Sequence, residues 1–184
     1  MKERVFDPRK LDVAAFARDA ASLQGEWPAT SLERLADAAA AEAPASQWPA
    51  VSWSVEGELR EVRGENQPWL HLKIGASVQL TCQRCLKAVG ETLALERSVR
   101  FVKDEASAAE LDVDSEEDVL ALQRHLDLAE LIEDELLLAL PLVPRHEICP
   151  QPLPVPAEDA DLIEEERPNP FAALAALKKG GGTQ

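Results

Sequence analysis

The stretch WLHLKIGASVQLTC, residues 69–82, decides the fold because its apolar residues recur at every second position. This alternation is typical of a strand with one buried face. It recurs at 50–63 and at 92–102, so the sequence predicts three consecutive strands. Consecutive strands with short connections favour an antiparallel meander, in which 69–82 and 92–102 form a long hairpin. We therefore expect an α+β fold built on an antiparallel sheet.

Three segments have apolar residues at helical spacing, and they predict helices at 10–24, 31–42 and 127–140. Thr30 and Glu33 form a capping box at the start of the second of these segments, in which each side chain satisfies a backbone amide of the first turn. We expect these helices to flank the sheet and pack against it.

The rest of the chain divides by composition. Gly64 to Pro68 is expected to form the turn before the long strand, and the acidic segment 103–118 to form a loop. We expect a single domain at 1–149, followed by a disordered, acidic and proline-rich tail at 150–184. A short helical segment at 170–179 can dock on the chain's own core or on a partner, and the sequence leaves both open.

Charge and composition restrict the class of protein. The chain has 184 residues, 46% of them hydrophobic, and a formal net charge of −15. Residues 60–103 nevertheless carry eight Lys or Arg against four Asp or Glu, whereas residues 104–168 carry three against twenty. This split can present a small basic face to RNA or a large acidic face to a basic protein. No apolar stretch reaches the roughly 20 residues of a membrane span, and no signal peptide is evident. We therefore expect a cytoplasmic protein.

Three cysteines and a histidine have the spacing of metal ligands. Cys82 and Cys85 form a Cys-x-x-Cys at the hairpin tip, and His146 and Cys149 form a His-x-x-Cys after the third predicted helix. Because structural zinc takes four such ligands in a tetrahedron, these residues predict a structural zinc ion. The alternative is a hairpin tip with ordinary reduced thiols. Redox chemistry is disfavoured because a thioredoxin-like motif opens a helix, whereas this one joins two strands.

A group of cations surrounds the hairpin tip. Arg84, Lys87, Arg97 and Arg100 are the predicted contacts with RNA or with a partner. The alternative is an ordinary solvated strand face, since no aromatic residue between positions 79 and 99 offers a stacking surface. His71, opposite the apolar face of its strand, is expected to meet solvent.

No catalytic constellation is evident. Glu133, Asp134 and Glu135 have no histidine or nucleophile placed beside them, so we expect a charged helix face, with Glu135 held by an arginine. The sequence contains no phosphate-binding loop, no dinucleotide-binding glycine turn and no nucleophile elbow. We therefore expect a protein that is not an enzyme and has no small-molecule substrate and no catalytic cofactor.

Three separated segments resemble one protein family. They are LTCQRCL at 80–86, LIEDELLLALPLVPRHEIC at 131–149 and RPNPFAALAALKK at 167–179. In this order they are similar to the YceD family of bacterial large ribosomal RNA subunit accumulation proteins. The resemblance supports the position of the first cysteine pair. It also implies further cysteines where this chain has His146 and Cys149, so the histidine is a departure.

The resemblance implies an accessory role in ribosome biogenesis, supporting the synthesis, processing or stability of 23S ribosomal RNA. Its partner would be the 23S precursor or a basic large-subunit ribosomal protein. The alternative function is an acidic, chaperone-like module that binds such a protein. A metal-dependent nuclease would need an open coordination position and a general base, and neither is evident.

Overall fold

The computed structural model describes residues 4–150, except 63, 114 and 116. The predicted tail at 150–184, with its helical segment at 170–179, lies outside the described residues apart from Pro150. Among the described helices, none combines the length and the apolar content that crossing a membrane requires.

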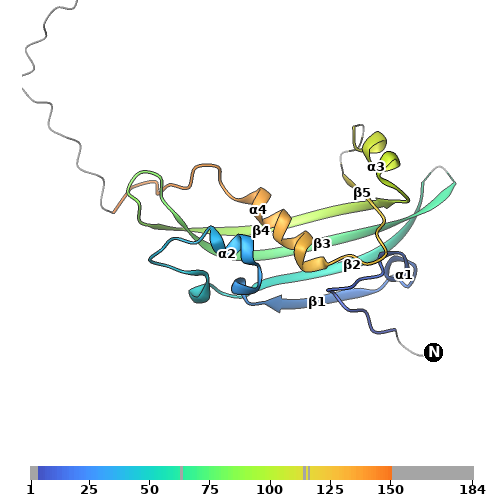
Figure 1. Cartoon of the computed structure of the whole chain (residues 1–184), viewed down its shortest axis with the longest axis horizontal. Helices are drawn as coiled ribbons and strands as arrows, with labels where there is room; N and C mark the ends of the chain where they lie inside the picture. The colour runs from blue at the N-terminus through green and yellow to red at the C-terminus, as the bar shows by residue number, and fades with distance from the viewer. Residues whose placement is uncertain (1–3, 63, 114, 116, 151–184) are drawn as a thin grey trace, which may run out of the picture. The chain divides into compact units, whose positions relative to one another are not determined.

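Five strands form one sheet in chain order (Figure 1). They are β1 (Ser22–Trp27), β2 (Val51–Val62), β3 (Glu65–Thr81), β4 (Ala88–Val102) and β5 (Asp118–Ala121). The first four pair antiparallel, and β5 runs parallel to β4. The predicted α+β fold is therefore confirmed, and β1 and β5 are strands that the sequence analysis missed.

The apolar side chains of β2, β3 and β4 face a core that helices cover on one side. The covering helices are α1 (Val13–Arg18), α2 (Glu33–Asp37) and α4 (Leu128–Ala139), whereas α3 (Glu105–Asp112) packs near β5 on the other face. Figure 1 shows α2 and α4 in front of the same face of the sheet. Leu128, Ile132 and Leu136, spaced four residues apart on α4, are fully buried against it. Asp127 begins α4 by accepting hydrogen bonds from the amides of Ala129 and Glu130.

The helix predicted at 10–24 is wrong beyond residue 18. Asp12 caps α1, and the chain turns at Ala20 into β1, whose residues pair with β2. At Gly57 of β2, an added Cβ would lie 2.7 Å from the Phe16 ring and 2.9 Å from the Phe16 carbonyl oxygen. Only glycine therefore lets the end of α1 rest so closely on the sheet.

The helix predicted at 31–42 is also too long, because α2 has five residues and no side chain from Thr30 caps it. Beyond α2, the amide of Ala40 donates to the carbonyl oxygen of Gln79 in β3 at 2.9 Å. This contact draws the alanine-rich segment out of helical geometry and onto the sheet. The local capping pattern is therefore overridden by a tertiary hydrogen bond.

The turn expected at Gly64 to Pro68 is shorter than predicted. Val62 already pairs with Glu65, and Gly64 has a φ of 84°, which glycine adopts readily. Pro68 pairs with Leu59 of β2. The pairing of β3 with β4 begins only at the next residue, Trp69. The missing amide of this proline is therefore tolerated in the strand.

The loop predicted at 103–118 is wrong, because it contains α3 and the start of β5. Asp104 caps α3 by accepting from the amide of Ser107 at 2.8 Å. Val102, Ala108 and Val119 form a second small buried cluster that holds α3 to this end of the sheet. The acidic composition concealed a short helix whose few apolar residues pack locally.

Candidate metal centre

The tip of the β3–β4 hairpin is a tight turn that carries two of the candidate ligands. The amide of Leu86 donates to the carbonyl oxygen of Cys82, and the amide of Cys82 to that of Lys87, both at 2.9 Å. Leu86 has a φ of 61°, in the left-handed region. These bonds place Cys82 and Cys85 on the same side of the turn, and both are buried.

The other two candidate ligands come from the segment after α4, which is fastened to this turn. The amide of Gln83 donates to the carbonyl oxygen of Pro144 at 2.9 Å. The Arg84 guanidinium donates to the carbonyl oxygens of His146 and of Glu147, the latter at 3.0 Å. Arg84 therefore holds the second pair of ligands in place.

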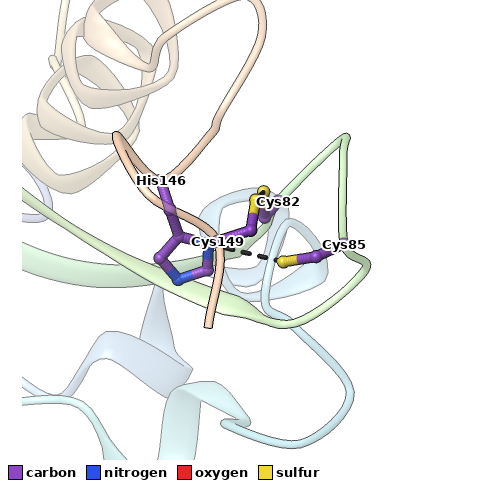
Figure 2. Close-up of side chains that lie close together, drawn as sticks. All are labelled: Cys82, Cys85, His146 and Cys149. Carbon is purple, nitrogen blue, oxygen red and sulfur yellow. Dashed lines mark hydrogen bonds between the residues drawn. The ribbon is translucent and has the colours of Figure 1, made fainter. Parts of the chain in front are cut away.

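The four side chains converge (Figure 2). The ligand atoms of Cys82, Cys85, His146 and Cys149 all lie within 4.8 Å of one another. The sulfurs of Cys82 and Cys149 are 3.9 Å apart, and the Cys85 sulfur is 3.5 Å from His146 Nδ1. Tetrahedral zinc, with Zn–S bonds of about 2.3 Å and Zn–N bonds of about 2.0 Å, separates two sulfurs by about 3.8 Å and sulfur from nitrogen by about 3.5 Å. The cluster can therefore hold a metal ion such as zinc.

A hydrogen bond to a backbone carbonyl determines which ring nitrogen of His146 is free to bind a metal. His146 Nε2 lies 3.0 Å from the carbonyl oxygen of Ala88, the first residue of β4. Because a carbonyl oxygen can only accept, Nε2 carries the proton and Nδ1 keeps its lone pair. Zinc-binding histidines commonly have such an outer hydrogen bond, which fixes both the tautomer and the ring orientation.

A family comparison covers the part of the chain that contains these four residues. The family described as "Large ribosomal RNA subunit accumulation protein YceD" matches residues 70–178. This chain belongs to the YceD family. A protein of the same description from Haemophilus influenzae is 29% identical over 180 residues, which cover 96% of this chain and 99% of that protein. No solved structure matches the chain.

In this YceD-family chain, the surroundings of the cysteines also affect their ionisation. Burial alone raises the pKa of the Cys82 thiol. The backbone amides of Cys85, Arg84 and His146, together with the His146 side chain, outweigh this effect and lower the pKa of Cys82 to about 5. For Cys149, burial and the neighbouring sulfurs raise the pKa above its usual range. The Cys82 sulfur is therefore better prepared than the Cys149 sulfur to bind a cation.

The structure does not gather the four predicted RNA-contact cations into one patch. Arg84 and Lys87 stay at the hairpin tip, where Lys87 lies 3.4 Å from Glu42. Arg97 faces the helices and pairs with the buried Glu135 of α4 at 2.9 Å, so the arginine expected beside that carboxylate is Arg97. Arg100 lies three positions further on and therefore on the opposite face of β4.

Proposed function

We propose that this YceD-family chain is a cytoplasmic, non-enzymatic accessory protein that supports the accumulation of 23S ribosomal RNA. The observation that carries the proposal is the family match, which includes all four candidate ligands of the metal centre. The name of the Haemophilus influenzae relative supports the same role. In this proposal the centre holds a structural zinc ion that joins the hairpin tip to the segment after α4.

A structural role for the centre follows from its ligand count. Three sulfurs and one imidazole complete a tetrahedron, whereas catalytic zinc sites keep one position for water or substrate. The rigid tip presents Arg84 and Lys87, and the segment pinned to it adds the exposed Arg145, which the sequence analysis did not select. These cations are the groups at the tip that could contact precursor RNA.

The test is the ratio of 23S to 16S ribosomal RNA in cells lacking the protein. We expect a selective fall in 23S that a wild-type copy restores and a Cys82→Ser, Cys85→Ser copy does not. A His125→Ala copy is the matched control, because His125 is exposed and lies outside the metal centre. A 23S to 16S ratio that stays normal without the protein would reject the proposed role.

A second candidate function is binding a basic protein of the large subunit. The net charge of −15 favours it. Lys87 also pairs with Glu42 and Arg97 with Glu135, so these two cations already have acidic partners within the chain. Apolar side chains are also exposed after α4, where Leu142 is 100% and Ile148 88% exposed. Neutralising the acids at 110–118 would abolish capture of a basic partner, whereas Arg84→Glu with Lys87→Glu would abolish RNA contact through the tip.

A further inference from the structure

The face of the sheet that points away from α1 and α4 carries an ordered set of polar side chains. Trp69 of β3 lies at its centre, with Glu58 of β2 and Arg100 of β4 as its two cross-strand neighbours. His71, two residues further on, lies opposite Ser98. Since side chains alternate along a strand, these residues share one face, which we name the open face. Among the described helices, α3 covers this face only near β5, at Val102 and Val119.

Arg60 lies over Trp69 and forms the most distinctive feature of the open face. Its guanidinium carbon is 4.6 Å from the centroid of the indole ring, and Trp69 as a whole is only 5% exposed. Glu58 fixes the same guanidinium from the side at 2.8 Å. The Arg60 side chain is nevertheless 42% exposed. Its guanidinium therefore stacks on the Trp69 ring and remains accessible to solvent.

The groups around this stack are held by hydrogen bonds. Arg100 Nε donates to Gln67 Oε1 at 2.5 Å. His71 Nδ1 lies 2.9 Å from Ser98 Oγ, and its Nε2 lies 2.8 Å from Glu58 Oε2. The expectation that His71 simply meets solvent is therefore wrong, because its ring is fixed on both sides. Polar groups fixed in this way are preorganised for a ligand that lies on the sheet.

A hollow of about 850 Å³ continues the open face from His71 toward the other end of the strands. Small side chains line it, among them Ser52, Ser54, Gly75 and Ala94, and its charged lining residues are Lys73, Glu26 and Glu96. Lys73 is four residues from Trp69 on the same face, a separation of about 14 Å along the strand. A short extended chain could lie along β3 between the arginine stack and this lysine.

We propose that the open face binds single-stranded RNA, with one base stacking on the Arg60 guanidinium and two phosphates, a few nucleotides apart, contacting Arg100 and Lys73. Bases of single-stranded RNA stack on guanidinium planes as well as on aromatic rings, and arginine and lysine bind the phosphates. Glu58 offsets the charge of Arg60, and Glu96, 3.6 Å from the Lys73 ammonium, offsets that of Lys73, so binding depends on stacking more than on charge. This inference rests on the proposed function, since it gives the ribosomal RNA a contact surface separate from the hairpin tip.

The test measures binding of a fluorescently labelled 12-nucleotide oligoadenylate RNA to the full-length, zinc-loaded protein by anisotropy at low salt. Arg60→Lys keeps the positive charge but removes the planar guanidinium on which a base can stack. We therefore expect the affinity for RNA to fall about tenfold, the typical effect of losing one stacked base. Arg100→Gln should also weaken binding and make it less salt-dependent. The matched controls are Arg18→Lys and Arg18→Gln on α1, an exposed arginine away from the open face; they should bind like wild type.

Three results would overturn the inference: no RNA binding by the wild type, wild-type affinity in Arg60→Lys, or loss of binding only when Arg84 and Lys87 are changed to Gln. The last would place the RNA at the hairpin tip. The 23S to 16S ratio in cells lacking the protein separates this failure from failure of the proposed function. A lowered ratio without RNA binding at the open face would reject the inference and keep the accessory role.

Discussion

Leu86 in the metal-binding turn has a backbone conformation that leucine adopts reluctantly. Its φ of 61° costs an L-residue about 1–2 kcal/mol, and its side chain is 62% exposed, so little packing compensates. Leu86→Gly should therefore raise the free energy of unfolding of the zinc-loaded protein by about 0.5–1 kcal/mol, after the greater freedom of glycine in the unfolded chain is counted. Urea unfolding measures this. Leu86→Ala keeps the strain and should show no gain; an equal gain in both would reject the explanation.

Glu58 gives a pH-dependent contribution at the open face. Hydrogen bonds from Arg60 and then from His71 lower the pKa of its carboxyl to about 2. A lowered pKa means that this contribution is complete above about pH 4.5, the value of an unperturbed glutamate, and is lost as pH falls toward about 2. Because the carboxylate is 44% exposed, the contribution is at most about 1 kcal/mol.

The Glu58 prediction is checked by comparing wild type with Glu58→Gln. The two should differ in urea midpoint at pH 7, and this difference should shrink between pH 4.5 and pH 3. Glu56→Gln is the control, since the exposed Glu56 on the same face has no ion pair among those found in the described residues. A difference that is constant over this range would contradict the assignment.

The candidate metal ligands could be predicted from the sequence, because their residue types and spacing are enough to identify them. Cys82, Cys85, His146 and Cys149 were selected by ligand type and interval, and the fold brings their ligand atoms within 4.8 Å. The proposed basic patch failed for a reason the sequence contained, because Arg97 and Arg100 have opposite parity on one strand and must face opposite ways. Which partner each would find, Glu135 or Gln67, depends on tertiary packing and could not be predicted.

At the scale of elements, Glu133 of α4 stabilises the short helix α2. Its Oε1 accepts from the amide of Leu35 at 3.1 Å, and its Oε2 accepts from Arg34 Nε at 3.0 Å. Helix α2 has no capping side chain of its own, so this carboxylate, 98 residues away, satisfies one of its first-turn amides. A helix of five residues is not stable alone and requires such tertiary contacts.

We predict that Glu133→Gln lowers the free energy of unfolding by about 1–3 kcal/mol, because an amide cannot accept both bonds and its NH₂ would face a guanidinium. Asp134→Asn is a matched control, since Asp134 binds the same Arg34 but is 48% exposed. We expect the control to cost less than about 0.5 kcal/mol. Equal effects in the two variants would show that Arg34 pairing, and not the buried bond to Leu35, is what matters.

Elements with strong periodicity were predictable, and short ones were not. β2, β3 and α4 follow the patterns of 50–63, 69–82 and 127–140 to within a few residues. The helix pattern at 10–24 runs into β1 because Leu23 continues its spacing, and because SLQGEW has only three inward positions, one of them a glycine. Its strand geometry comes from pairing with β2, a long-range contact that local propensity does not encode.

At the scale of the molecule, the metal centre joins parts of the chain that are distant in sequence. Cys82 and Cys85 belong to the main hydrophobic core, and the partly buried Cys149 packs against it. The ligand pairs come from the β3–β4 hairpin and from the segment that follows α4. Metal binding therefore closes a loop of more than sixty residues, and its free energy contributes to folding.

We predict that the purified protein contains one zinc ion per chain and that chelation lowers its unfolding temperature. Hydrogen exchange should localise the effect, because without metal the amides at 82–88 and 144–149 lose their shared anchor. Amides near Leu70 and Leu72 at the other end of β3, fully buried beneath α1, should stay protected.

Cys149→Ser should reproduce the exchange pattern of the chelated protein even when zinc is supplied, whereas His125→Ala should retain zinc and wild-type protection. Uniform exchange changes over the whole sheet, or full zinc content in Cys149→Ser, would show that these four residues do not form the anchor.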